Sequence, residues 1–87
     1  MGNTPTCKGQ LSFYLNSAKT ETKCINKLGY LRSAKYLLQN PTSINPNFDC
    51  SNVNNDISSN IDSAINKCSY EDVNEANIYI DKAISLL

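Results

Sequence analysis

The sequence contains no histidine and no tryptophan, and only three of its 87 residues are glycine. Without histidine, the most common general base of enzymes and one of the two usual zinc ligands are missing. The glycines Gly2, Gly9 and Gly29 stand alone, so the chain has no glycine-rich loop to hold a phosphate group. We therefore expect a protein that is not an enzyme, has no catalytic residues and uses no cofactor.

Long apolar runs are also missing. No segment approaches the roughly 20 apolar residues that a membrane-spanning helix needs. Residues 1–20 lack the apolar core of a signal peptide. We expect no transmembrane segment, and an exported protein with this sequence would be a mature form to which Met1 had been added.

Four cysteines are present in this short chain: Cys7, Cys24, Cys50 and Cys68. A fold of this size buries only about 60–65% of the surface of its unfolded chain, so its core needs reinforcement. An even number of cysteines then favours two disulfides and an oxidising compartment. The other interpretation is four buried thiols in a cytosolic protein, because free cysteine packs like a small apolar residue. We expect no metal site, since zinc sites use closely spaced cysteine pairs, often with histidine.

Apolar residues recur every three or four positions in four segments, which is the spacing of amphipathic helices. Two Asn-Pro steps indicate a loop over residues 40–49, and residues 1–6 are expected to be a disordered polar lead. We predict an all-α, up-down bundle in which residues 7–87 form one domain of two helical hairpins. It has four helices, or three if residues 8–39 form one long helix. The predicted core stripes are Leu11, Tyr14, Leu15 and Ala18; Ile25, Leu28, Leu31, Ala34 and Leu38, with Tyr30 and Leu37 beside them; Val53, Ile57, Ile61, Ala64 and Ile65; and Val73, Ala76, Ile80, Ala83, Ile84 and Leu87.

Polar residues at the segment boundaries predict where helices begin. Thr20 is a candidate N-cap for the second helix, and Asp49 or Ser51 is expected to start the third. Ser69 with Asp72 resembles a capping box for the last helix.

Helix direction constrains the disulfide pairing. In an up-down bundle the odd-numbered helices start at one end and the even-numbered helices at the other. Cys7 and Cys50 open odd-numbered helices, whereas Cys24 lies early in the second helix and Cys68 lies where the third meets the fourth. Cα atoms in a disulfide must approach within about 7 Å. The geometry therefore favours Cys24–Cys68 and Cys7–Cys50.

Charge is segregated along the chain although the net charge is zero. Residues 1–45 carry six basic residues and one acidic residue, and residues 46–87 carry two basic and seven acidic residues. The two halves either attract each other or present a charged docking surface to a protein partner. A zero net charge without interleaved aromatic residues argues against nucleic-acid binding. The candidate partner-binding residues are Lys19, Lys23, Lys27 and Lys35 in the basic half, where the first three follow helical spacing, and Glu71, Asp72 and Glu75 at the start of the last helix.

Together these features predict a non-catalytic protein-interaction module that is secreted or lies in a bacterial periplasm or on a cell surface. An inhibitor, an immunity protein for a toxin, and a subunit of a surface or secretion assembly all fit that description. The alternative is a membrane-anchored structural or viral surface protein. The start of the chain, Met1 to Thr6, matches the pattern for myristoylation of Gly2, which would place the protein at a viral or cytosolic membrane face.

Overall fold

The computed structural model describes residues 7–39 and 53–87, and these residues form four helices. They are α1 (Cys7–Thr20), α2 (Cys24–Gln39), α4 (Asn55–Ser69) and α5 (Val73–Ser85). No strand occurs in these two ranges, so the predicted all-α fold is confirmed. The lead at 1–6 and the loop at 40–49 lie outside the described residues.

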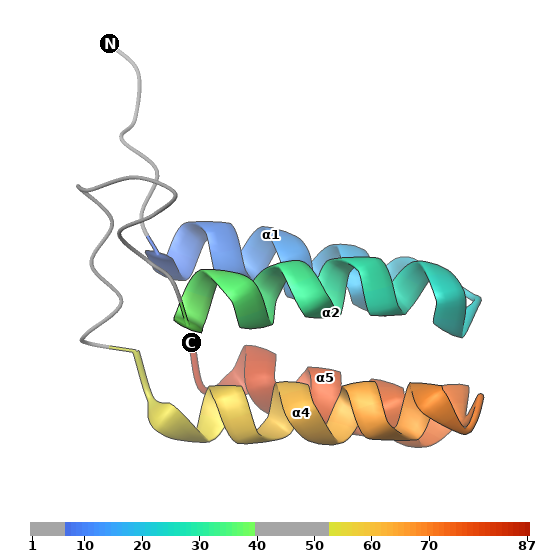
Figure 1. The fold of residues 1–87 in the computed structure, drawn as a ribbon. Helices are drawn as coiled ribbons and strands as arrows, with labels where there is room; N and C mark the ends of the chain where they lie inside the picture. The colour runs from blue at the N-terminus through green and yellow to red at the C-terminus, as the bar shows by residue number, and fades with distance from the viewer. Residues whose placement is uncertain (1–6, 40–52) are drawn as a thin grey trace, which may run out of the picture.

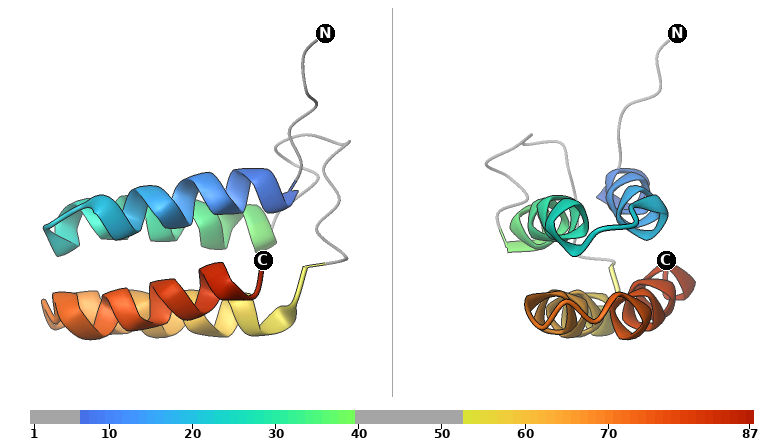
Figure 2. Two further views of the ribbon diagram at one scale, coloured as in Figure 1. Left: turned by 180° about the vertical axis from the view of Figure 1, so that it is seen from behind. Right: turned by 90° about the vertical axis from the view of Figure 1, so that its right-hand side faces the viewer.

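The helices are arranged as two antiparallel hairpins stacked on each other (Figure 1). One hairpin is α1 with α2 and the other is α4 with α5. Between the hairpins, α2 packs on α4 and α1 packs on α5. The end-on view in Figure 2 shows one helix at each corner of the bundle. The up-down arrangement is therefore confirmed in its four-helix form. A single helix over 8–39 is wrong, because α1 ends at Thr20 and a turn precedes α2.

The core is built by small and branched apolar side chains that all four helices direct inwards. For α1, α4 and α5 the buried residues other than Cys7 and Cys68 fall on the predicted stripes. Tyr14, Ile65 and Ile84 pack at the edge of the core and are half-buried. The fully buried apolar residues of these three helices are Leu11, Leu15 and Ala18; Ile57, Ile61 and Ala64; and Ala76, Ile80 and Ala83.

On helix α2 the centre of the predicted stripe is confirmed, because Leu31 and Ala34 are fully buried, whereas its two ends differ. Ile25 was expected in the core but is 77% exposed, and Leu37 is fully buried where Leu38 was expected. The cause is Cys24, which faces the neighbouring hairpin to form a disulfide. Successive side chains on a helix are about 100° apart, so Ile25 points away from the core. Lys27 takes one of the buried positions.

The helix ends differ from the predicted caps. The side chain of Asn54 caps α4 by accepting a hydrogen bond from the amide of Asp56 at 2.8 Å. Asp72, rather than Ser69, caps α5 by accepting one from the amide of Glu75 at 3.1 Å. Ser69 is still the last residue of α4, and Asp49 and Ser51 lie outside the described residues.

Thr20 ends α1 instead of starting α2, and its hydroxyl donates a hydrogen bond to the carbonyl of Ser17 at 2.9 Å.

Among the described helices, none has both the length and the apolar character that crossing a bilayer requires.

Candidate functional site

A disulfide between Cys24 and Cys68 joins the two hairpins. Cys24 is the first residue of α2 and Cys68 lies in the last turn of α4, so both are at the same end of the bundle. Their Cα atoms are 5.1 Å apart. The predicted pairing of these two cysteines is confirmed.

The predicted partner of Cys7 is Cys50, which lies outside the described residues. Cys7 itself is disulfide-bonded, and no described cysteine is free.

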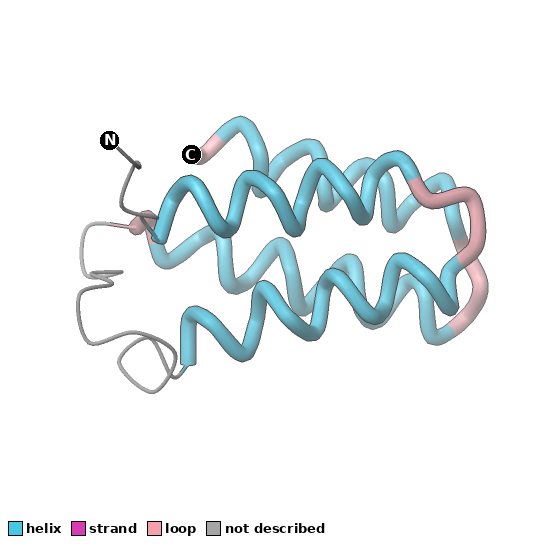
Figure 3. The backbone as a smooth tube through the Cα atoms, turned by 90° about the horizontal axis from the view of Figure 1, so that it is seen from above, coloured by secondary structure: helices cyan, strands magenta, loops and turns pink. Residues whose placement is uncertain are grey.

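Both hairpin turns lie at the disulfide-bonded end of the bundle. Figures 1 and 3 place the α1–α2 turn and the α4–α5 turn side by side there, with the C-terminus at the opposite end. We call this end, made by residues 21–28 and 68–76, the turn end. Its interior is a small apolar cluster of Cys24, Cys68 and Ala76, against which Leu28 and Val73 pack. This cluster and the disulfide hold the two turns together.

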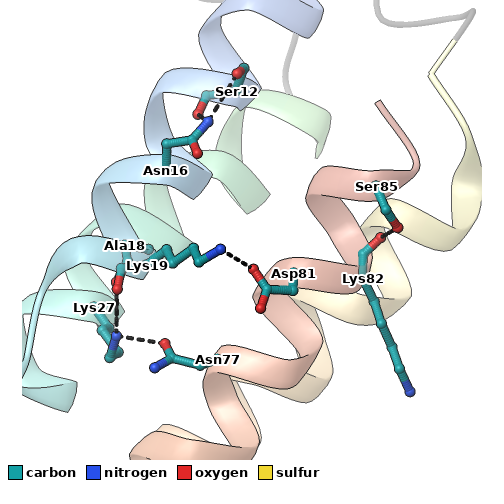
Figure 4. A network of polar contacts seen from close by, with 9 residues as sticks. All are labelled: Ser12, Asn16, Ala18, Lys19, Lys27, Asn77, Asp81, Lys82 and Ser85. Carbon is teal, nitrogen blue, oxygen red and sulfur yellow. Dashed lines mark hydrogen bonds and ion pairs between the residues drawn. The ribbon is translucent and has the colours of Figure 1, made fainter.

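Lys27 belongs to the turn end and its side chain is fully buried; Figure 4 shows its contacts with Ala18 and Asn77. Its Nζ donates hydrogen bonds to the carbonyls of Ala18 at 3.0 Å and Lys19 at 3.3 Å. It also donates one to Oδ1 of Asn77 at 2.7 Å. The carbonyls belong to the last turn of α1, where a helix lacks internal donors and a positive charge is favourable. Lys27 therefore ties α2 to both α1 and α5.

Burial lowers the pKa of Lys27 from its ordinary value because the charged form loses its hydration, and the nearby carboxylate of Glu21 partly opposes this shift. The prediction that Lys27 belongs to a docking surface is wrong, since the side chain has no exposed area. Sequence reasoning treated it as a surface residue because lysine is almost never fully buried unless it is paired. Its spacing from Cys24 and Leu31 was the signal for a core position.

Two other candidate lysines form ion pairs between the hairpins. Nζ of Lys19 on α1 lies 2.7 Å from Oδ1 of Asp81 on α5 (Figure 4). On the other side of the bundle, Nζ of Lys35 on α2 lies 2.7 Å from Oδ1 of Asp62 on α4. These contacts support the interpretation that the oppositely charged halves attract each other.

The predicted lysine stripe does not form. Lys19 lies on α1, Lys23 lies in the α1–α2 turn and Lys27 lies on α2, so the three residues share no helix face. Of the three, only Lys23 is both exposed and without an ion pair in the described structure.

The three acidic candidates come together at the turn end. Glu71 lies in the α4–α5 turn with a left-handed backbone (φ 58°), Asp72 caps α5, and Glu75 is in the first turn of α5. That position suits the positive end of the helix dipole. Within the described residues, the ion pairs of the bundle do not include any of these carboxylates.

Sequence reasoning missed two exposed apolar side chains at the turn end. Tyr70 is 78% exposed and Ile25 is 77% exposed, more than the other exposed large apolar residues. Ile25 follows Cys24, and Tyr70 comes two residues after Cys68. Given the disulfide and the usual Cα spacing of 3.8 Å, their Cα atoms lie within about 16 Å of each other. Ile25 was expected in the core.

The outer seam between α4 and α5 carries two open, shallow depressions. One measures about 380 Å³ and is lined by Asp56, Ser59, Asn60, Lys82, Ser85 and Leu86. The next measures about 340 Å³, includes Lys67 and Tyr79, and shares Ser59 with the first. In the described part of the chain, no cluster of three or more His, Cys, Asp or Glu residues is able to hold a metal ion.

The turn end thus contains two exposed apolar side chains, a disulfide, and three carboxylates that form no ion pair with the residues the structure describes. Comparison of the chain with protein-family models, with curated proteins and with solved structures found no match.

Proposed function

We propose that the chain is a non-catalytic module that binds another protein in an oxidising compartment, and that the turn end is its docking surface. An inhibitor, an immunity protein and a subunit of a surface assembly all act in this way. The observation that carries the proposal is the exposure of Ile25 and Tyr70, which lie one residue after Cys24 and two residues after Cys68, the two cysteines of the disulfide.

Large side chains contribute most to binding when they sit on a rigid frame. Tyrosine is enriched among the residues that dominate interface energies, and it loses little conformational freedom when it binds. The disulfide and the apolar cluster of Cys24, Cys68 and Ala76 brace both turns from inside. A partner would therefore meet two anchors that are already in place, which reduces the ordering cost of association.

The size of the turn end is suitable for a protein interface. A standard interface buries about 800 Å² on each partner. Two anchors within about 16 Å of each other fit inside such a footprint. Their polar surroundings also match the usual arrangement of an apolar centre and a polar rim.

The disulfide supports the choice of compartment. Disulfides persist in secreted, periplasmic and cell-surface proteins, whereas cytosolic thiols are kept reduced. A buried bond between residues 44 positions apart restricts the unfolded chain strongly. This stabilisation is available only where the bond stays oxidised.

Photo-cross-linking in the source cells tests the proposal. A benzophenone amino acid replaces Tyr70 in one variant and, as a control, the exposed Tyr36 of α2 in another. The expected result is one adduct, identified by mass spectrometry, that forms from position 70 and is absent from position 36. Identical adducts from both positions would contradict the turn end as the docking surface.

Affinity measurements with the purified partner complete the test. Ile25→Ser/Tyr70→Ser should weaken binding by about 100-fold or more, because residues that anchor an interface each contribute about 2 kcal/mol. The control Phe13→Ser/Tyr36→Ser also removes two exposed apolar side chains, and it should change the affinity less than threefold or so. Melting temperatures of both variants show that the fold is intact.

A further inference from the structure

We infer that the partner binds the turn end through a cationic protein surface, one that carries lysine or arginine around an apolar recess. This inference rests on the proposed function and names the chemistry of the partner. The net charge of the chain is zero, but some charged side chains remain available at the turn end once the bundle has formed, and the inference rests on these.

Three of the six basic residues of the first hairpin interact within the bundle. Lys27 is buried against three oxygen atoms. Lys19 and Lys35 are bound to carboxylates of the second hairpin. At the turn end this leaves Lys23 as the exposed lysine of the α1–α2 turn.

The negative charges at the turn end are not used in this way. Glu71 and Asp72 directly follow Tyr70, and Glu75 lies one turn further along α5. Glu21 adds a fourth carboxylate, whose field acts on Lys27. Residues 21–28 and 68–76 therefore carry four carboxylates against two lysines, one of which is the buried Lys27, and Tyr70 directly precedes two of these carboxylates.

Other charges do not cancel this excess. Two helices end and two begin at the turn end, so their opposite dipoles largely offset each other. Lys67 lines the depression on the outer α4–α5 seam with Asp62 and Tyr79.

Charge around an apolar anchor selects the partner. Complementary charges speed association and like charges across an interface oppose it. A cationic partner pairs with the carboxylates, and an arginine or lysine beside Tyr70 gains a further attraction to the face of its ring. The same carboxylates oppose a symmetric dimer in which two turn ends meet, because that contact would bring like charges together.

A displayed library of random peptides, each about twelve residues long, tests this inference on the oxidised full-length protein at about 50 mM salt. Selected peptides should be rich in lysine and arginine and should carry an aromatic or aliphatic residue. Their affinity should fall at least tenfold or so at about 300 mM salt, because screening weakens exposed charge pairs.

Charge reversal provides the matched control. Glu71→Lys/Glu75→Lys leaves the capping carboxylate of Asp72 in place, and it should abolish binding of the cationic peptides and select acidic ones instead. Asp56→Lys changes a carboxylate in the first turn of α4, at the opposite end of the bundle, and should leave their affinity within about twofold. Melting temperatures control for the effect of each lysine on its helix dipole.

The outcomes separate the two proposals. Peptides that need Ile25 and Tyr70 but show no preference for basic residues overturn the cationic partner and leave the docking surface standing. Cationic peptides that bind equally well to Ile25→Ser/Tyr70→Ser overturn the docking surface proposed above. The cationic partner is also overturned if no selected peptide changes its affinity for Glu71→Lys/Glu75→Lys. A dimer formed through the turn end has the same consequence.

Discussion

The two hairpins carry opposite charge and use it differently. Three lysines of the α1–α2 hairpin interact within the molecule: Lys27 is buried, and Lys19 and Lys35 form ion pairs with the other hairpin. The α4–α5 hairpin contributes Asp62 and Asp81 to those ion pairs, and three of its other carboxylates, Glu71, Asp72 and Glu75, lie at the turn end. Charge segregation in the sequence therefore reflects two needs, attraction between the hairpins and a charged outer surface.

The largest expected effect on stability comes from removing the disulfide that joins the two hairpins. Cys24→Ala/Cys68→Ala should lower the free energy of unfolding by about 4 kcal/mol, because the disulfide closes a long loop and restricts the unfolded chain. Urea unfolding under non-reducing conditions measures the change. Reductant added to this variant then reports the remaining contribution of the Cys7 disulfide. An unchanged urea midpoint in the variant would show that packing alone holds the hairpins together.

A smaller effect distinguishes the lysines of the first hairpin. Lys27→Ala should cost about 2–4 kcal/mol in unfolding free energy, because it empties a buried site and leaves three acceptors without a donor. Lys35→Ala should cost at most about 1 kcal/mol, since it breaks only a half-exposed ion pair. Chemical denaturation of both variants checks the ranking. Equal costs would mean that Lys27 is not buried in solution.

The smallest effect is a pH dependence that belongs to Lys27. Its pKa is lowered in the folded protein by burial, with Glu21 partly opposing the shift, so the unfolded chain binds more protons in the window just below pH 10.5. Stability contributed by this group must rise with pH across that window. Wild type should therefore gain melting temperature relative to Lys27→Met as the pH rises toward 10.5. A constant difference between the two curves would refute the lowered pKa.

The sequence predicted the parts of the fold in which apolar residues lie on one side of a helix. Helix α4 has a single apolar face, formed by Ile57, Ile61 and Ala64, so the sequence identifies the side that packs in the core. Helix α2 has apolar residues on several sides, and the choice between Ile25 and Cys24 depended on a disulfide partner 44 positions away. Periodicity carries no information about such a distant contact.

The candidate site was predicted in part for related reasons. Glu71, Asp72 and Glu75 were identified because a helix start favours acidic residues whatever the tertiary structure. Lys27 was misplaced because its burial depends on the carbonyls at the end of α1, which only the folded bundle brings near. Tyr70 was missed because it lies in a turn, outside any helix stripe.

The Cys24–Cys68 bond also gives the molecule a ring topology. The backbone from residue 24 to residue 68 and the bridging sulfurs form a closed circuit that includes all of α2 and most of α4. A protease that cut this circuit once between Gln39 and Val53 would produce two polypeptides that remain one molecule. Such a nicked form would migrate as a single species in denaturing gels and separate into two fragments only after thiol treatment, and its turn end would stay assembled.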